Sequence, residues 1–194
     1  MIRKIALLPG HSSRDGGAVV CAGLFKGKGE FTLAGAYYLP ALADKLRAYG
    51  YDTIITTRDV AGGTTPSYSA RAANATGADL ALEFHFNSAT PTACGCEVMH
   101  WGGSPTGRAF AEQLSASLAA ILGVRDRGPL AVPTPDNRGT EAFRRSAMPF
   151  FMIEPCFAGS NPREAEIFCR MIDNGEWVTK AAAAIHAAIC KTYS

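Results

Sequence analysis

Two kinds of hydrophobic spacing alternate along this chain. Short apolar runs predict buried strands, and segments in which apolar residues recur every three or four positions predict helices with one apolar face. We expect strands at residues 2–8, 51–56, 79–86, 96–100 and 150–153. Such alternation is typical of an α/β domain with a largely parallel, twisted sheet covered by helices on both faces.

The helical spacing falls in segments 30–49, 67–75 and 174–190, and in one that starts at Ser104-Pro105 with an apolar stripe of Phe110, Leu114, Leu118 and Ile121. Pro40 should kink or break the first segment, because proline removes a hydrogen bond and clashes with the preceding turn. The stretch 125–145 is rich in proline, glycine and arginine. It is expected to be a long surface loop, a kind of segment that is often functional.

Composition fits a single globular domain over residues 1–194. Hydrophobic residues make up 47% of the chain and charged residues 19%, which excludes an intrinsically disordered protein. The net charge of +2 at pH 7 is too small to indicate a nucleic-acid partner. No repeat or linker marks a second domain.

The apolar run at the N-terminus is too short for the core of a signal peptide, and no stretch approaches the roughly 20 apolar residues of a membrane helix. We therefore expect a protein made in the cytoplasm without a signal peptide, which acts outside the cell only after release or non-standard export. Six cysteines in 194 residues do not indicate a disulfide scaffold, so free thiols are expected.

Three ionisable side chains follow predicted strands. His11 comes after the turn Pro9-Gly10, His85 lies near the end of the run 79–86, and Glu154 ends the run before Pro155. Ligands of open α/β sheets gather outside the carboxyl ends of the strands, so these side chains are candidates to meet.

Glu30 follows a glycine-rich loop at the first turn of a predicted helix. Helix capping would explain a carboxylate there, because the helix dipole favours it. Two imidazoles and one carboxylate, however, are a usual ligand set for catalytic zinc. The sequence contains no HExxH, GxSxG or Walker motif.

At this point the chain resembles a known family. The segments "LLPGHSSRDGGAV", "TTR", "SARAANATGADLALEFHFNS", "GCEV", "RDRG" and "IEPCFAGSNP" occur in that order, with Glu30 heading a helix between the first two. Together they resemble the zinc-dependent N-acetylmuramoyl-L-alanine amidases of the Amidase_3 type, over residues 4–190.

The resemblance implies that His11, Glu30 and His85 bind Zn²⁺ and that Glu154 is the catalytic carboxylate. It further implies a sheet of six strands with about as many helices, peptidoglycan as substrate, and hydrolysis of the amide between N-acetylmuramic acid and L-alanine. A compact phage or prophage endolysin is the protein type it suggests, with a bacterial exported enzyme as the alternative. Arg58 is expected to pair with a backbone group or a carboxylate near the site.

One departure from the family pattern concerns Glu83, which stands where a small residue is usual. Glu83 shares a strand face with His85, so it is a candidate to orient that ligand or to contact substrate; a paired carboxylate at the sheet surface is the alternative. Asn87, on the same face, is a candidate substrate contact.

Other functions stay open at the level of sequence. A zinc peptidase that cuts within the stem peptide would have the same metal ligands, and a non-catalytic wall-binding module is a third possibility, against which Glu154 argues. His100 with Cys94 and Cys96 lacks the usual spacing of a zinc site. His186 is expected to be a surface or packed histidine.

Overall fold

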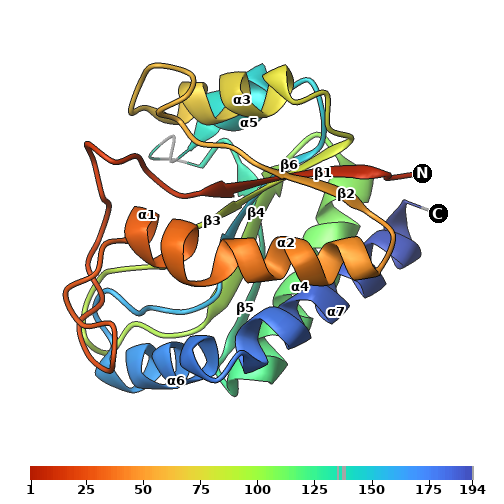
Figure 1. Ribbon diagram of the computed structural model, residues 1–194. Coiled ribbons are helices and arrows are strands. Elements are labelled where there is room, and N and C mark those ends of the chain that lie inside the picture. The colour runs from red at the N-terminus through yellow and green to blue at the C-terminus, as the bar shows by residue number, and fades with distance from the viewer. Residues whose placement is uncertain (135, 137–138, 194) are drawn as a thin grey trace.

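The computed structural model describes residues 1–134, 136 and 139–193 (Figure 1). Six strands form one sheet in the order β2-β1-β3-β6-β4-β5. Their bounds are β1 Lys4–Pro9, β2 Asp52–Ile55, β3 Leu80–Phe84, β4 Cys96–Trp101, β5 Asp126–Val132 and β6 Phe150–Glu154. Strands β1, β2, β3 and β6 run parallel to one another, whereas β4 pairs antiparallel with β6 and parallel with β5. The prediction of a single α/β domain with a largely parallel sheet is confirmed.

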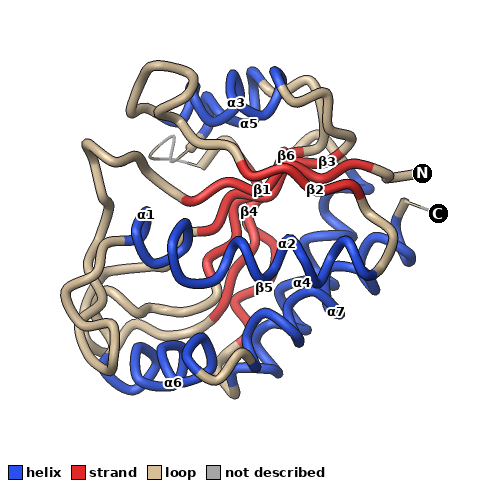
Figure 2. The backbone as a smooth tube through the Cα atoms, in the orientation of Figure 1, coloured by secondary structure: helices blue, strands red, loops and turns tan. Residues whose placement is uncertain are grey.

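Helices cover both faces of the sheet (Figures 1 and 2). One face carries α3 (Pro66–Ala75) and the short α5 (Thr140–Arg145). The other carries α1 (Glu30–Thr32), the π-helical segment η1 (Leu33–Tyr38), α2 (Leu39–Ala48), α4 (Pro105–Leu122), α6 (Pro162–Asp173) and α7 (Glu176–Thr192). Both termini lie at one side of the sheet and the loop between β1 and α1 at the other (Figure 1).

Alternation along the strands divides the core into two layers. On β3, Leu80, Leu82 and Phe84 pack in the larger layer, beneath the helices of the second face. Ala81 belongs to the smaller layer beneath α3 and α5. Successive strand residues point to opposite faces, so Glu83 and His85 lie on the same face as Ala81, as the alternation in the sequence predicted.

The interpretation of residues 125–145 as one long loop is wrong. Residues Asp126–Val132 form the edge strand β5 and Thr140–Arg145 form α5. An edge strand has a partner on one side only, so it tolerates Pro129, and β5 fully buries only Val132, which hides the apolar pattern of a strand. Positions 135, 137 and 138 of the expected loop lie outside the described residues.

Two helical features also differ from expectation. The kink expected at Pro40 takes the form of the π-helical segment Leu33–Tyr38, after which Pro40 lies in the first turn of α2, where its missing N–H costs nothing. Helix α6 was not predicted, although Asn161 caps it by accepting a hydrogen bond from the Glu164 N–H, and Pro162 is its first residue. The sequence carries the same kind of signal here as at Ser104-Pro105.

Two further expectations concern membrane spans and disulfides. In the described part of the chain, none of the helices has the length and apolar character needed to span a membrane. All six cysteines are described, and no two of them form a disulfide.

Candidate active site

The first site residue, His11, follows the carboxyl end of β1, on the side of the sheet opposite the chain termini. The Gly10 N–H donates to the Phe84 carbonyl over 2.7 Å, which extends the pairing of β1 with β3 by one residue. The backbone then turns sharply at His11, whose φ of 65° lies in the left-handed region. Behind the ring, Asp15 Oδ2 lies 3.1 Å from His11 Nδ1, which leaves Nε2 directed into the site.

The carboxylate of Glu30 is anchored by the backbone. Glu30 begins α1 and is 4% exposed. Its Oε1 accepts a hydrogen bond from the Ala18 N–H at 2.9 Å, and its Oε2 accepts one from the Phe86 N–H at 3.1 Å. These two bonds connect the β1–α1 loop and the end of β3 to one side chain, so the carboxylate is held in place before any ligand binds.

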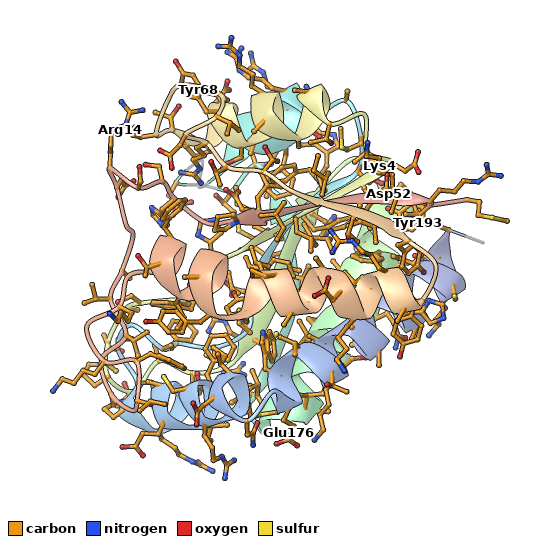
Figure 3. All side chains as sticks on the ribbon, in the orientation of Figure 1. Lys4, Arg14, Asp52, Tyr68, Glu176 and Tyr193 are labelled. Carbon is orange, nitrogen blue, oxygen red and sulfur yellow. The ribbon has the colours of Figure 1, made fainter. Side chains whose placement is uncertain are left out.

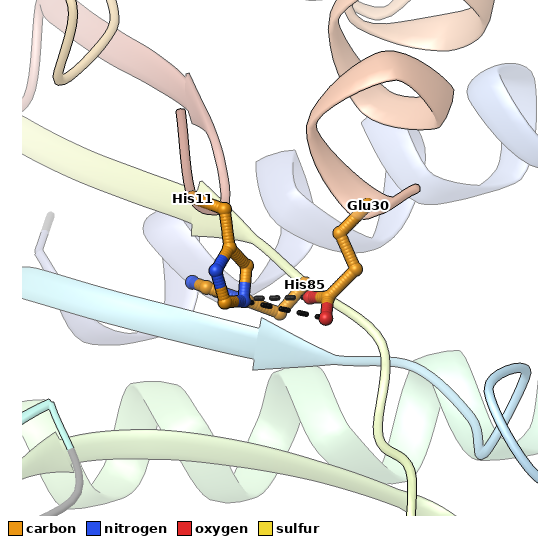
Figure 4. A group of neighbouring side chains, drawn as sticks. All are labelled: His11, Glu30 and His85. Atoms are coloured by element: carbon orange, nitrogen blue, oxygen red, sulfur yellow. Dashed lines mark hydrogen bonds and ion pairs between the residues drawn. The ribbon is translucent and has the colours of Figure 1, made fainter. Parts of the chain in front are cut away.

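Both histidine rings converge on this carboxylate (Figure 4). His85 Nδ1 lies 2.9 Å from Glu30 Oε2, and His11 Nε2 lies 3.3 Å from Glu30 Oε1. One ligand atom from each of the three residues lies within 4.8 Å of the others. Tetrahedral zinc with ligands at about 2.0–2.1 Å separates its ligand atoms by roughly 3.3 Å, so the donor set and its spacing fit this metal.

Two glycines provide the space for this convergence. A Cβ on Gly10 would lie 2.4 Å from His85 Nδ1. Gly17 has a φ of 77°, and a Cβ there would lie 2.5 Å from the His11 ring and 2.8 Å from Glu30 Oε1. Any side chain at either position would push the ligand groups apart.

Electrostatic coupling holds the cluster together in the metal-free protein. Burial alone would raise the pKa of the Glu30 carboxyl, but hydrogen bonds to His11 and His85 and their positive charges hold it well below its usual range. Burial alone would lower the pKa of His85, but the hydrogen bond to Glu30 and the charges of Glu30 and Glu83 raise it to about 10. Burial also lowers the pKa of His11, but the hydrogen bond to Glu30 and the charge of Glu30 outweigh this effect and raise it. The carboxylate thus favours the protonated form of each ring, and the two rings favour the ionised form of Glu30.

Glu83 lies beneath His85 and is fully buried. Its Oε1 accepts hydrogen bonds from Ser69 Oγ at 2.6 Å and from the Arg58 guanidinium at 3.0 and 3.2 Å. Burial would raise the pKa of this carboxyl, but the charge of Arg58 and the nearby His85 lower it to about 2. The expected pairing of Arg58 with a carboxylate is thus present.

The ligand cluster opens into a cavity of about 800 Å³. Glu154, at the end of β6, lines this cavity together with Asn87, Ser88 and the segment Thr64–Pro66. The structure therefore brings His11, Glu30, His85, Glu154 and Asn87 to one cavity, whereas Glu83 is not part of its wall.

A buried polar group behind the cavity was not singled out from the sequence. Glu97 faces Glu154 across the antiparallel pair of β4 and β6. Its Oε1 accepts a hydrogen bond from Asn87 Nδ2 at 3.1 Å, and its Oε2 accepts one from Arg127 Nε at 2.6 Å. Asp15 was also missed, although it stands only four residues after His11; the segments "GCEV" and "SSRDGG" were the available signals.

The remaining histidines lie elsewhere. His100 is buried at the far end of β4, which runs opposite to β6, and its Nδ1 bonds to the Trp101 carbonyl. His186, on α7, stacks on Tyr49 and contacts Tyr51 Oη at 2.9 Å. Within the described residues, the group of His11, Glu30 and His85 is the one that could hold a metal ion.

Solved structures with the same fold include the three proteins that follow. Cwp6 from Clostridium difficile matches with a TM-score of 0.75 at 19% identity, covering 100% of this chain, which spans 30% of Cwp6. The catalytic domain of the CD27L endolysin, which targets Clostridia difficile, matches with a TM-score of 0.73 at 20% identity over 98% of each chain. The N-acetylmuramyl-L-alanine amidase Ami1 from Mycobacterium abscessus matches with a TM-score of 0.70 at 20% identity over 99% of each chain. Comparison with curated protein sequences found no match.

Identities this low show a shared fold and no more. The family comparison is more specific: the family model described as Amidase_3, N-acetylmuramoyl-L-alanine amidase, matches residues 5–191. The match includes all the residues that line the cavity around His11, Glu30 and His85. The chain therefore belongs to the Amidase_3 family of N-acetylmuramoyl-L-alanine amidases.

Proposed function

We propose that this protein is a zinc-dependent hydrolase of peptidoglycan that cleaves the amide between the lactyl group of N-acetylmuramic acid and L-alanine. The observation that carries the proposal is the convergence of one ligand atom each from His11, Glu30 and His85 within 4.8 Å of one another at a cavity that Glu154 also lines. Membership in the amidase family supports the choice of bond.

His11, Glu30 and His85 would hold the metal. Zinc bound there supplies Lewis-acid chemistry, because it lowers the pKa of water and polarises a carbonyl group. The Glu30 carboxylate, fixed by the Ala18 and Phe86 N–H groups, brings the negative charge that a divalent cation requires. Asp15 orients the His11 ring from behind, as carboxylates do for many metal-ligating histidines.

Glu154 would act as the general base and acid. Its carboxylate takes a proton from the attacking water and then delivers it to the nitrogen of the leaving L-alanine. The low exposure of Glu154, 4%, limits competition from bulk solvent for that proton. Asn87 is the proposed substrate contact, since its amide is already oriented by Glu97 and the residue lines the same cavity.

The place of action follows from the substrate. We propose that the protein works on the cell wall as a compact, lysin-like enzyme; the endolysin catalytic domain among the proteins of the same fold supports this. Release through a lesion in the membrane, or a dedicated export route, would bring the enzyme to its substrate.

Digestion of purified peptidoglycan tests the bond. The amidase should release stem peptides that begin with L-alanine, with no new reducing sugar ends, because glycosidic cleavage needs a different pair of carboxylates. Mass spectrometry of the products decides. Fragments that begin at a later stem residue would instead identify a peptidase, and binding to the wall without products would identify a non-catalytic module.

A further inference from the structure

The carboxylate of Glu83 is bonded on one side only. Its Oε1 receives all the hydrogen bonds from Arg58 and Ser69. Its Oε2 is buried, forms no hydrogen bond, and lies 3.5 Å from His85 Nε2. The second carboxylate oxygen of Glu83 therefore faces Nε2 of His85, the ring nitrogen on the side away from Glu30.

His85 Nε2 has the complementary property. It too is buried and forms no hydrogen bond, while Nδ1, on the other side of the ring, faces Glu30. A buried polar atom without a hydrogen bond is unfavourable, and these two atoms form only a long ion pair with each other. Here they face each other at a distance slightly longer than that of a good hydrogen bond.

The chemistry of imidazole links the two sides of the ring. A neutral histidine carries one N–H, so a metal on Nδ1 requires the proton to be on Nε2. Glu83 Oε2 is then the acceptor in front of that proton. A small shift of either side chain closes the gap between the two atoms.

We propose that Glu83 is a positioning residue for the metal site: it accepts the Nε2–H of His85 and so selects Nδ1 as the nitrogen that binds zinc. Arg58 and Ser69 hold Glu83 in place for this purpose. The inference rests on the proposed zinc-dependent function.

The rest of the fold fits this assignment. Glu83 lies near the end of β3, paired with Leu8 on β1 and with Met152 on β6. A residue in the middle of a six-stranded sheet cannot move far, so its carboxylate is a rigid reference for the ring of His85. The carboxylate behind the other histidine, Asp15, is by contrast more than half exposed.

The isosteric variant Glu83→Gln gives the sharpest test. Its amide oxygen can still accept from Arg58, which then turns the amide NH₂ group toward Nε2. That group favours the wrong tautomer of His85. We expect the zinc dissociation constant, measured by chelator competition, to rise about 10- to 100-fold.

Nitrogen-15 NMR of the histidine rings supplies a readout that a purely structural role would not change. In the zinc-loaded wild type, His85 should show the Nε2–H tautomer with a slowly exchanging proton. In Glu83→Gln, and in the second variant Glu83→Ala, that proton should exchange quickly or move to the other nitrogen. Glu164→Gln is the matched control: it neutralises a buried carboxylate that accepts from the backbone N–H groups of Gly95 and Phe157, so the His85 signals should not change.

Two results would overturn the proposal: zinc on Nε2 of His85, or an unchanged Nε2–H signal and zinc affinity in folded Glu83 variants. Failure of the proposed function is a separate result. It would appear as wild-type protein that binds zinc through Nδ1 of His85 but releases no stem peptides from peptidoglycan.

Discussion

Oε2 of Glu30 lies 2.9 Å from Nδ1 of His85, although 55 positions separate these residues in the sequence. The same oxygen accepts a hydrogen bond from the backbone of Phe86, the next residue after His85. The Glu30 carboxylate thus connects the start of α1 with the end of β3, and His11 lies close to the other oxygen of this carboxylate, Oε1. The site is therefore a junction of three chain segments, which makes its geometry sensitive to changes in each.

Zinc content is the first consequence. The purified protein should carry about one zinc ion per chain and lose activity on chelation, because the three donors match a catalytic zinc site. His85→Ala should lose both metal and activity. Atomic absorption on active protein checks this, and active wild-type enzyme without zinc would contradict it.

Glu154 should separate metal binding from turnover. Glu154→Gln keeps the size of the side chain and leaves His11, Glu30 and His85 untouched, so zinc content should be unchanged. Its kcat on peptidoglycan should fall on the order of 10²- to 10⁴-fold, the usual contribution of general acid–base catalysis. Turnover near the wild-type rate would rule out Glu154 as the base.

Gly17 should be intolerant of substitution, in contrast to its neighbour. Gly17→Ala places a Cβ 2.5 Å from the His11 ring in a backbone with φ of 77°, which costs roughly 1–2 kcal/mol for the left-handed conformation alone. We expect lower thermal stability and weaker zinc binding. Gly16→Ala is the control, because a Cβ there meets nothing within 4 Å. Calorimetry and chelator competition on both variants measure the difference, and equal behaviour would contradict the role of Gly17 in making room for the ligands.

Asp79 should contribute a pH-dependent part of the stability. Its Oδ2 accepts hydrogen bonds from the N–H groups of Arg3 and Lys4, and these bonds lower its pKa in the folded state. A lowered pKa means that the contribution is present above the unfolded value, about 3.9, and is lost as the pH falls through the folded value. Asp79→Asn should therefore be less stable than wild type at pH 7, and the gap should narrow in acid.

Urea unfolding at several pH values checks this expectation. Asp52→Asn serves as control, since Asp52 forms an exposed ion pair with Lys4 at 3.8 Å. This pair lies at the amino ends of β1 and β2, on the other side of the molecule from Arg14 (Figure 3). An exposed pair of this kind contributes little. A gap between wild type and Asp79→Asn that stays constant with pH would show that the charge of Asp79 is not responsible.

Much of the framework can be predicted from the sequence alone. Buried strands such as Lys4–Pro9 and Phe150–Glu154 consist mainly of apolar residues. The residue that follows or ends such a run lies at the carboxyl end of its strand. That local rule placed His11, His85 and Glu154 together. The alternation of side chains along β3 similarly puts Glu83 and His85 on one face, since they are two positions apart in an extended chain.

Other features depend on contacts between distant segments. The reversed direction of β4 and β5, which brings Glu97 opposite Glu154, follows from strand pairing and not from the composition of either strand. The edge strand β5 has too few buried positions for its hydrophobic pattern to reveal it. The partners of Glu83, namely Arg58, Ser69 and His85, come from separate elements, and only packing of α3 onto the sheet brings them to one carboxylate. Local sequence determines which residues lie at the carboxyl ends of the strands. The distance between two side chains on different elements is decided only when the helices pack onto the sheet.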